Sequence, residues 1–514
     1  MGRRLRVTII DFTCRGPTNA MWARLMHPNY ASIMPQVVGV WCEEAGHDVR
    51  FIAYTGFEDL EKEVAGDADI VFFSAFTQAA LLTYALSNLY RKRGAITVLG
   101  GPHARCYPQD AAKYFDYVLG FTDKAVIEEV LRDCSQHRPE GQQISARQQP
   151  ATLPGVKERW KFVDQTLAKA PALKIVPMIG SLGCPYTCSF CIDSTVDFQP
   201  LGFDQMREDL KFLLTKMKRP RVGWHDPNFG VRFDDYMNAI EEAVPAGSMD
   251  FIAESSLSLL SEPHLKRLQK NGFKGILPGI ESWYTLGNKT KTGKAAGMDK
   301  VRQVSDHVNM MQQYVPFIQT NFVLGLDMDS GPEPFELSKR FIDLTPGAFP
   351  AYSLLSCFGQ AAPLNIELQR DGRVLPFPFH FINNYHSMNV KPKNYEWKEF
   401  YSYVIDLTKY AFSWKSIYRR FQANTERIPA WMNALRAVSA EGFGRIKYYS
   451  TIRGLLDTDP TVRKYFEGES TILPEFYHQR IKQELGVFYD ALPDGAIYHD
   501  HLAYLNAQPM VKLA

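Results

Sequence analysis

Three cysteines stand close together in the middle of the chain, in the stretch GCPYTCSFC that begins at Gly183. Cys184, Cys188 and Cys191 follow the spacing CxxxCxxC. Thiolates are the usual ligands of iron–sulfur clusters, so this loop can hold three irons of a four-iron cube and leave the fourth open to a small molecule. The alternatives are a structural zinc site, which usually has a second cysteine pair, and thiols that are close only by chance. We see no second pair in the sequence, and we predict a [4Fe–4S] site.

An aromatic residue, Phe190, directly precedes the last of these cysteines. With it, the loop resembles the signature of the radical S-adenosylmethionine (SAM) enzymes, and the resemblance extends over residues 173–350. It implies that SAM chelates the open iron and is split by one electron into methionine and a 5′-deoxyadenosyl radical, which abstracts a hydrogen atom from a substrate. It also implies that the Phe190 backbone lies near the adenine, and that an external flavodoxin- or ferredoxin-type protein supplies the electron.

Apolar, strand-like segments follow the loop, and polar residues stand directly after them. In parallel α/β folds the ligand site lies at the carboxyl ends of the strands. The succession of strand ends is similar to that of radical SAM enzymes and implies a partial (β/α)6 barrel. The positions that the resemblance assigns to SAM binding are Phe190, Asp226, Asn228, Glu254, Ser255, Glu281, Ser282 and Gly325. Carboxylates suit the ammonium and hydroxyl groups of SAM, and helix capping or solvation is the alternative for them.

The first 135 residues alternate between short apolar segments and helical ones. The strand-like segments lie at residues 5–10, 49–54, 69–74, 96–99 and 117–119. This alternation predicts a doubly wound, Rossmann-like α/β domain whose parallel sheet is covered on both faces. No GxGxxG follows the first segment, which disfavours a dinucleotide site.

Parts of this first domain resemble the cobalamin-binding domain that precedes many radical SAM domains. The matching features are GHDV at 46–49, a serine at the end of the third strand, and LGGPHA at 99–104. Only glycine lets a bulky planar group lie against the backbone. The cobalamin-binding positions that the resemblance implies are Ser74, Gly100, Gly101, Pro102 and Gly120.

The chain departs from that cobalamin-binding pattern in two places. No DxHxxG follows the first strand, which implies cobalamin without a lower histidine ligand, and the usual GEGE is replaced by GFTD at 120–123. An empty first domain is the alternative. We expect His103 to be a hydrogen-bonded surface residue and not a cobalt ligand.

The remaining segments complete the domain plan. Residues 136–170 are rich in Gln, Arg, Pro and Glu and are typical of a linker, residues 171–350 form the predicted barrel, and residues 351–514 are mainly helical. Cys357 is either a buried inert thiol or a thiol of the active site. Basic residues among aromatic ones, such as Arg419, Arg420 and Arg436, favour either packing or a lid over an anionic or isoprenoid-like substrate.

The whole-chain composition limits the possible partners. A net charge of +2 without a dominant basic tract disfavours nucleic acid as a partner. No apolar stretch approaches the length of a membrane span, and the first apolar run is too short for a signal peptide. The cysteines outside the loop are scattered, which is typical of the reducing cytoplasm.

We therefore predict a cytoplasmic, cobalamin-dependent radical SAM enzyme that methylates an unactivated carbon of a small molecule. The cofactors are a [4Fe–4S] cluster, SAM and cobalamin. Cyclisation, oxidation or ring rearrangement by the same domains without methyl transfer is the first alternative. A non-catalytic sensor that binds cobalamin or a cluster is the second.

Overall fold

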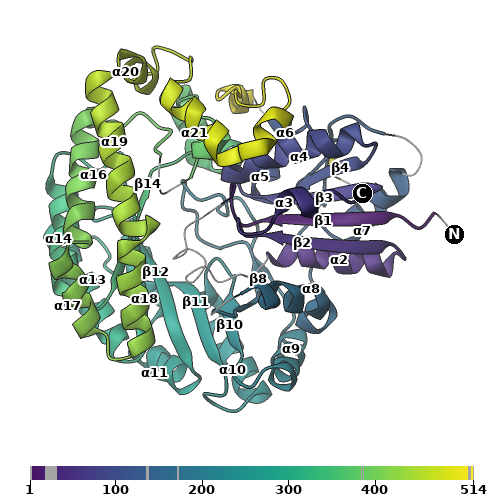
Figure 1. Ribbon diagram of the computed structural model, residues 1–514. Helices are drawn as coiled ribbons and strands as arrows, with labels where there is room; N and C mark the ends of the chain where they lie inside the picture. The colour runs from purple at the N-terminus through teal and green to yellow at the C-terminus, as the bar shows by residue number, and fades with distance from the viewer. Residues whose placement is uncertain are drawn as a thin grey trace.

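The computed structural model describes residues 3–17, 32–134, 138–170, 173–383, 385, 387–506 and 511–512. Two parallel sheets organise this part of the chain, and helices pack around them (Figure 1). The first sheet has the strand order β15-β6-β5-β4-β3-β1-β2. Its strands are β1 (Arg6–Phe12), β2 (Asp48–Tyr54), β3 (Ile70–Ala75), β4 (Ile96–Gly100), β5 (Tyr117–Leu119), β6 (Gln142–Ser145) and β15 (Val511–Lys512). The predicted doubly wound domain is confirmed.

Both faces of the first sheet are buried, which explains its almost uninterrupted apolar strands. Along β1, Val7 and Ile9 point to one core cluster, whereas Ile10 and Phe12 point to the other. This alternation is the period of two that any strand imposes on its side chains. The helices of this domain are α2 (Ile33–Glu44), α3 (Leu60–Glu63), α4 (Ala80–Lys92), α5 (Pro102–Cys106), α6 (Pro108–Ala111) and α7 (Lys124–Asp133).

The segment expected to be a linker is largely folded; residues 136 and 137 lie outside the described part of the chain. β6 extends the first sheet by pairing with β5, and α8 (Val156–Lys169) packs on α2. Phe162 of α8 fills the space over Gly39, where a β-carbon would lie 2.8 Å from its ring. Although the composition of this segment is polar, it forms an amphipathic helix, because its few apolar side chains are spaced over three turns.

The second sheet is a six-stranded, all-parallel partial barrel with the order β14-β13-β12-β11-β10-β7. Its strands are β7 (Val176–Met178), β10 (Arg221–Trp224), β11 (Asp250–Ser256), β12 (Phe273–Glu281), β13 (Phe317–Leu324) and β14 (Phe349–Leu354). Its outer helices are α9 (Phe203–Lys216), α10 (Phe233–Ala243), α11 (Glu262–Lys270), α13 (Gly297–Gln312) and α14 (Glu333–Leu344), and a short α12 (Gly287–Thr290) follows β12. The predicted (β/α)6 architecture is confirmed.

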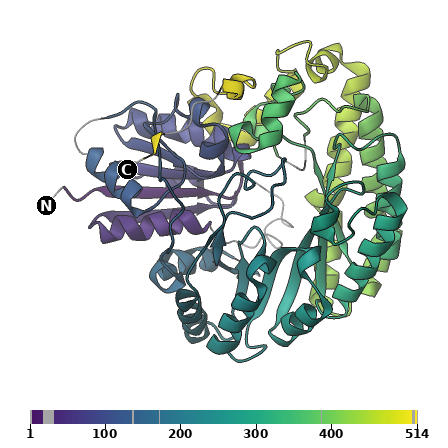
Figure 2. The ribbon, with the colours of Figure 1, turned by 180° about the vertical axis from the view of Figure 1, so that it is seen from behind.

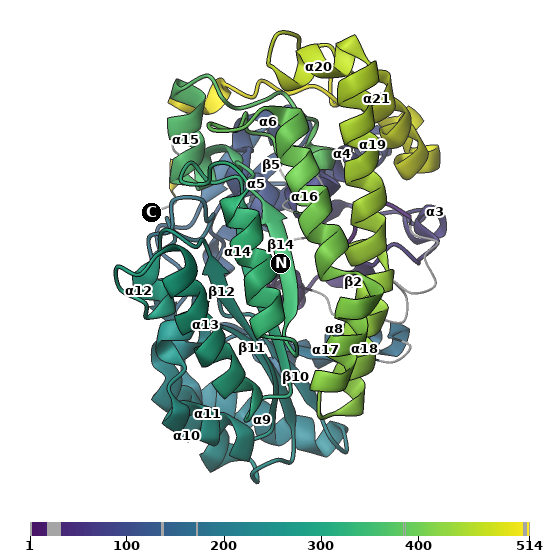
Figure 3. The ribbon, with the colours of Figure 1, turned by 90° about the vertical axis from the view of Figure 1, so that its left-hand side faces the viewer.

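The C-terminal region is helical and wraps around the barrel on the side of β14 (Figures 1 and 3). Figure 2 shows from behind that the last helices return to the first domain, where β15 joins the edge of its sheet. Its helices are α15 (Pro363–Arg370), α16 (Trp397–Ala411), α17 (Trp414–Ala423), α18 (Arg427–Val438), α19 (Arg445–Thr458), α20 (Pro460–Phe466) and α21 (Glu475–Leu485). None of the helices in the described ranges has both the length and the apolar character needed to cross a bilayer.

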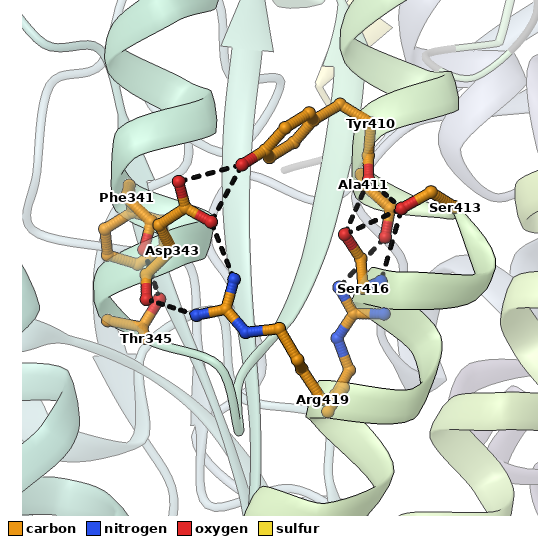
Figure 4. Close-up of polar contacts among 9 residues, drawn as sticks. Phe341, Asp343, Thr345, Tyr410, Ala411, Ser413, Ser416 and Arg419 are labelled. Atoms are coloured by element: carbon orange, nitrogen blue, oxygen red, sulfur yellow. Dashed lines mark hydrogen bonds and ion pairs between the residues drawn. The ribbon is translucent and has the colours of Figure 1, made fainter.

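Polar side chains fasten this helical region to the barrel (Figure 4). Arg419 of α17 and Tyr410 of α16 both donate to the carboxylate of Asp343, each at 2.8 Å. The neighbouring Arg420 is buried and donates to the carbonyls of Ala348 and Ala411. Of the two alternatives for these arginines, the structure therefore favours packing over a substrate lid.

Candidate functional site

A small hairpin closes the base of the cysteine loop. β8 (Ser181–Leu182) and β9 (Gln199–Pro200) pair in antiparallel register on either side of the loop. Gly183 has φ +69°, and a β-carbon there would lie 2.5 Å from the carbonyl oxygen of Asp197. Only glycine fits this position, so the residue before Cys184 is dictated by the turn. The loop is thus held over the end of β7, at the carboxyl edge of the barrel.

Asp226 lies directly beneath this loop. Its carboxylate accepts hydrogen bonds from the Gly180 N–H (3.1 Å), from the Ser181 hydroxyl (2.6 Å) and from the Tyr236 hydroxyl. It is 1% exposed, and burial raises its pKa. The sequence assigned Asp226 to SAM, whereas the structure places it as an anchor of the strand that enters the loop.

The three thiols are half-buried and electrostatically coupled. Burial raises the pKa of all three, that of Cys191 to about 11, and the Lys289 ammonium acts in the opposite direction. In the part of the chain that the structure describes, no three His, Cys, Asp or Glu side chains are placed to hold a single metal ion. A four-iron cube takes each thiolate at a separate corner, and its binding displaces the thiol protons. Three soft ligands beside an ammonium group fit such an anionic cluster.

A strained turn presents Glu281 next to the cysteines. Glu281 ends β12 with φ +66°, and the Ser282 N–H donates to the carbonyl of Ile280 at 2.8 Å, which makes a γ-turn centred on Glu281. A γ-turn with positive φ is rare and strained for a residue other than glycine, and such strain is concentrated at functional sites. Lys289 lies 2.6 Å from the Glu281 carboxylate. A β-carbon at Gly279 would meet that carboxylate oxygen at 2.1 Å, so glycine makes room for the pair.

Lys300 supports the same turn from below. It belongs to α13, is fully buried, and donates to the carbonyls of Ser282 (2.6 Å) and Thr285 (2.5 Å). Burial lowers its pKa to about 8. The Ser282 hydroxyl is also engaged, because it accepts the Tyr284 N–H at 3.1 Å. The sequence did not single out Lys289 or Lys300, since neither stands in a motif or at the end of a strand.

Glu254 is the open carboxylate of the site. It lines a 320 Å³ cavity inside the barrel together with Trp224, His225 and Gln319. Its side chain is accessible, yet protein surrounds it closely, and burial together with the Glu281 charge raises its pKa to about 7. The neighbouring strand ends are tied to each other instead.

The tie runs between β10 and β11. Asn228 donates to the Ser256 hydroxyl at 2.8 Å and accepts the Ser256 N–H at 3.2 Å. Ser255 is buried next to this pair and would collide with any β-carbon at Gly230. Asn228 and Ser255, both assigned to SAM from the sequence, therefore pack within the frame that positions Glu254.

The last barrel positions of the sequence prediction lie further along the sheet edge. Gly325 follows β13 with φ +87°, and its N–H donates to Asp329 at 3.0 Å. A β-carbon there would lie 3.1 Å from the side chain of Met388, so the turn requires glycine. Phe190 is partly buried and packs against the main core cluster.

A larger cavity of 530 Å³ lies between the first domain and the cysteine loop. All five positions predicted for cobalamin line it, namely Ser74, Gly100, Gly101, Pro102 and Gly120. The barrel contributes Gly183, Asp193, His225 and Pro227 to the opposite wall. A β-carbon at Gly100 would have only the Phe73 carbonyl, at 3.9 Å, as a neighbour, so this backbone is open to the cavity. The arrangement fits a broad planar group lying against backbone.

Arg105 joins the two walls of this cavity. It belongs to α5 of the first domain, donates to the carbonyl of Ile192 at 2.7 Å and lies 3.5 Å from Asp193, just after the last cysteine. The expectation that nearby His103 lies on the surface was wrong, because His103 is fully buried, but its expected hydrogen bonding is confirmed. The His103 ring shares a 2.8 Å hydrogen bond with the Tyr84 hydroxyl.

Cys357 follows β14 and is buried. Its backbone is bracketed by Asn389, which accepts the Cys357 N–H at 2.8 Å and donates to its carbonyl at 2.9 Å. Burial raises the pKa of the thiol far above its usual value. The structure therefore favours the inert alternative, and all eight cysteines of the chain are free thiols.

Comparisons with known proteins agree with this arrangement. Residues 32–131 match the family model of the B12 binding domain. The bacteriochlorophyllide d C-12(1)-methyltransferase of Chlorobaculum tepidum is 23% identical over 73% of this chain and 81% of its own length.

Two solved structures share the fold. The radical SAM methyltransferase TsrM from Kitasatospora setae superposes with a TM-score of 0.52 and 15% identity, over 72% of this chain and 78% of that one. The cobalamin-dependent SAM radical enzyme OxsB superposes with a TM-score of 0.52 and 11% identity, over 96% of this chain and 85% of that one. The second superposition includes almost the whole C-terminal helical region.

Proposed function

We propose that this chain, a radical SAM enzyme with an N-terminal cobalamin-binding domain, transfers a methyl group to an unactivated carbon of a small molecule. The observation that carries the proposal is the cavity shared by Gly100 of the first domain and Gly183 of the cysteine loop. A cofactor bound in the first domain there faces the cluster loop directly. Proximity of this kind turns a reaction between two bound groups into an effectively intramolecular one.

Each domain has a separate task in this proposal. Residues 1–135 bind the corrinoid, residues 171–350 bind the cluster and SAM, and residues 351–514 close the space for the substrate. When bound, the cluster with SAM supplies a hydrogen-abstracting radical, and methylcobalamin supplies the methyl group. The protein binds, orients and excludes water.

The barrel residues divide into ligands, contacts and anchors. We assign cluster ligation to Cys184, Cys188 and Cys191. We assign contact with SAM to Glu254 and Glu281 at the strand ends and to the backbone near Phe190, Ser282 and Gly325. Asp226, Asn228 and Ser255 act as anchors in this proposal, because protein groups already surround them.

The wider setting is also part of the proposal. Eight free thiols suit a reducing cytoplasm, where a flavodoxin- or ferredoxin-type protein donates the electron. Because the Chlorobaculum relative is named for bacteriochlorophyllide d, that pigment is the first substrate probe.

The test is anaerobic purification with cobalamin supplied, followed by iron, sulfide and corrinoid analysis and a SAM-cleavage assay with dithionite. We expect about four irons and one corrinoid per chain, with both 5′-deoxyadenosine and S-adenosylhomocysteine formed. With a substrate and methyl-labelled SAM, the product gains one labelled methyl group. Deoxyadenosine with loss of hydrogens from the product and no corrinoid would instead assign cyclisation or oxidation. Failure of the loaded protein to cleave SAM would leave a binding or sensor protein.

A further inference from the structure

The outer surface of α17 and α18 carries an unusual concentration of exposed, large apolar side chains. We call it the aromatic face, and it consists of Trp414 (69% exposed), Tyr418 (61%), Ile428 (61%), Trp431 (58%) and Phe443 (36%). Single exposed apolar residues are ordinary, but a connected group of them marks an interaction site.

Ring contacts pair some of these residues with each other or with a neighbouring aromatic residue. The rings of Trp414 and Phe443 lie 5.6 Å apart, and Trp431 lies 5.1 Å from the ring of Phe421. Figure 3 shows α17 and α18 side by side on the outside of the molecule. The inner sides of the same helices already fill the core with Ile417, Ala430 and Ala437. Residues other than those of the aromatic face therefore provide the core packing of these helices.

Two exposed cations adjoin the aromatic face. Lys415 follows Trp414, Arg427 precedes Ile428, and no ion pair of the described residues includes either cation. The nearby carboxylates are neutralised, since Glu426 pairs with Lys274 at 2.9 Å and Glu441 pairs with Arg436 at 2.6 Å. The surface thus presents indole and phenol rings beside the unpaired cations Lys415 and Arg427.

We propose that the aromatic face seats this protein on an anionic lipid surface. Tryptophan and tyrosine favour the boundary between water and acyl chains, because one part of each ring is apolar and another part is polar. Lysine and arginine beside them are attracted to anionic headgroups, and amphipathic helices with this composition lie in the plane of the interface.

Helix α18 lies between the aromatic face and the barrel cavity. Trp431 is exposed, whereas Met432 and Arg436, about 100° and 140° from it around the same helix, line the 320 Å³ barrel cavity that contains Glu254. One helix therefore separates the lipid-facing surface from the interior of the barrel. Resting on the proposed function, we infer that the substrate is a lipid-dissolved, largely apolar molecule that enters the barrel beside α18.

The experiment is co-sedimentation of the full-length, cofactor-loaded protein with vesicles. Vesicles of phosphatidylcholine alone are compared with vesicles that also contain phosphatidylglycerol, at low and high salt. We expect binding to the anionic vesicles that weakens with salt, because salt screens the lysine and arginine charges. The triple variant Trp414→Ser, Ile428→Ser, Trp431→Ser lowers the partition coefficient by about tenfold or more.

The matched control replaces exposed apolar residues elsewhere. Ile472, Val487 and Tyr498 are 70%, 59% and 56% exposed and lie outside the aromatic face. Their triple serine variant keeps wild-type binding. Equal binding by both triple variants, or binding by neither the wild type nor the control, overturns the proposal. A wild-type dimer that the aromatic-face variant converts to monomer would assign the face to a second copy instead.

SAM cleavage in solution separates this inference from the proposed function. The aromatic-face variant keeps its iron, its corrinoid and its uncoupled formation of 5′-deoxyadenosine, because none of the replaced residues lies at the cysteine loop or the domain cavity. Loss of vesicle binding with intact SAM cleavage supports the docking face. Absence of SAM cleavage in the wild type contradicts the proposed function and leaves the docking result to be judged by itself.

Discussion

The two parallel sheets of this protein present their ligand ends to each other, and the two ends are built differently. The end of the first sheet is lined by Ser74, Gly100, Gly101 and Gly120, which expose backbone. The end of the barrel carries Glu254, the Glu281–Lys289 pair and three thiols. Both ends follow the rule that ligands bind at the carboxyl ends of parallel strands. The comparison shows that the sheet topology determines where a ligand can bind. The side chains at that place determine which kind of ligand fits.

The two ends also tolerate unusual backbone in different ways. At the first sheet the positive φ of +87° falls on Gly101, where it costs little. At the barrel a positive φ falls on Glu281, which costs about 1–3 kcal/mol and needs support. That support comes from Lys289 and Lys300. We therefore expect the end of the first sheet to tolerate substitutions of neighbouring side chains. We expect the charged end of the barrel to lose stability when a supporting lysine is replaced.

The largest expected effect comes from removing a thiol. Alanine at Cys184, Cys188 or Cys191 abolishes iron binding and SAM cleavage, because a cluster held by two thiolates is not retained. Corrinoid binding by the first domain persists. Iron, corrinoid and deoxyadenosine are measured together, with Cys134→Ala as the matched control. SAM cleavage by all three variants would refute the assignment of the loop.

A side chain at Gly100 tests the other end of the comparison. Gly100→Val places methyl groups into the open cavity and lowers corrinoid retention by about tenfold, while iron and SAM cleavage are kept. Gly202→Val, whose β-carbon would meet nothing within 4 Å, is the control. If Gly100→Val retained as much corrinoid as the wild type, the cofactor would not lie against this edge of the sheet.

The Glu281–Lys289 pair tests whether the charged end depends on mutual support. Lys289→Met leaves a poorly exposed carboxylate without its partner, so we expect about 2 kcal/mol lower unfolding free energy and weaker SAM binding. Lys294→Met is the exposed control. The double variant with Glu281→Gln recovers stability but not SAM binding. Recovery of both would make the pair purely structural.

Glu254 gives the charged end a pH dependence. Its pKa is raised from 4.5 to about 7, with burial and Glu281 raising it and Lys289 opposing them. The unfolded chain loses this proton first, so Glu254 lowers stability as pH rises from about 4.5 to 7. Because we propose that ionised Glu254 contacts the SAM ammonium, we expect SAM binding to strengthen by up to about tenfold per pH unit until about pH 7.

The control for this profile is Glu254→Gln, which removes both slopes. His225, Arg436 and Glu441 line the same cavity, and burial lowers the pKa of His225 to about 4, so histidine does not account for a transition near 7. Calorimetric SAM binding and urea unfolding across this pH range provide the measurement. A profile unchanged by Glu254→Gln would exclude this residue as its source.

The smallest expected effect is on an ion pair away from both ligand sites, and it serves as a reference for the larger effects. Arg419 and Asp343 form a partly exposed pair at 2.8 Å (Figure 4). A double-mutant cycle with Arg419→Ala and Asp343→Ala should give a coupling of at most about 1 kcal/mol in urea unfolding. Iron and corrinoid contents stay at wild-type values. A loss of either ligand in Arg419→Ala would show that the helical region controls the site from a distance.

Much of the architecture could be predicted from the residues alone. β5 has the predicted bounds, and the other four predicted strands of the first domain differ from the structure by one or two residues at their ends. The three-cysteine loop was predicted from its spacing, and the partial (β/α)6 barrel was implied by the resemblance to radical SAM enzymes. The strands and the loop are local features, because strand periodicity and the spacing of ligands on one loop are properties of neighbouring residues.

What the tertiary structure decided depends on residues that are distant in the sequence. The segment 136–170 reads as a linker by composition, yet it becomes β6 and α8 because a sheet edge and α2 are available to receive it. From the sequence, Arg419 and Arg420 could be either substrate ligands or packing residues. The structure favours packing, because Arg419 binds Asp343 and Arg420 binds a backbone carbonyl.

The same distinction applies within the site itself. Asp226 follows β10 and Glu254 lies near the end of β11, and their surroundings make one an anchor of the loop and the other an open carboxylate. Lys289 and Lys300 have no local signature at all. The sequence by itself determined most strand positions and the three-cysteine spacing, because these are properties of neighbouring residues, and the family resemblance added the barrel and the cofactor of each domain. Which carboxylates remain open, and which cations support the strained turn, only the folded chain decided, because burial and partners at long range set the state of a charge.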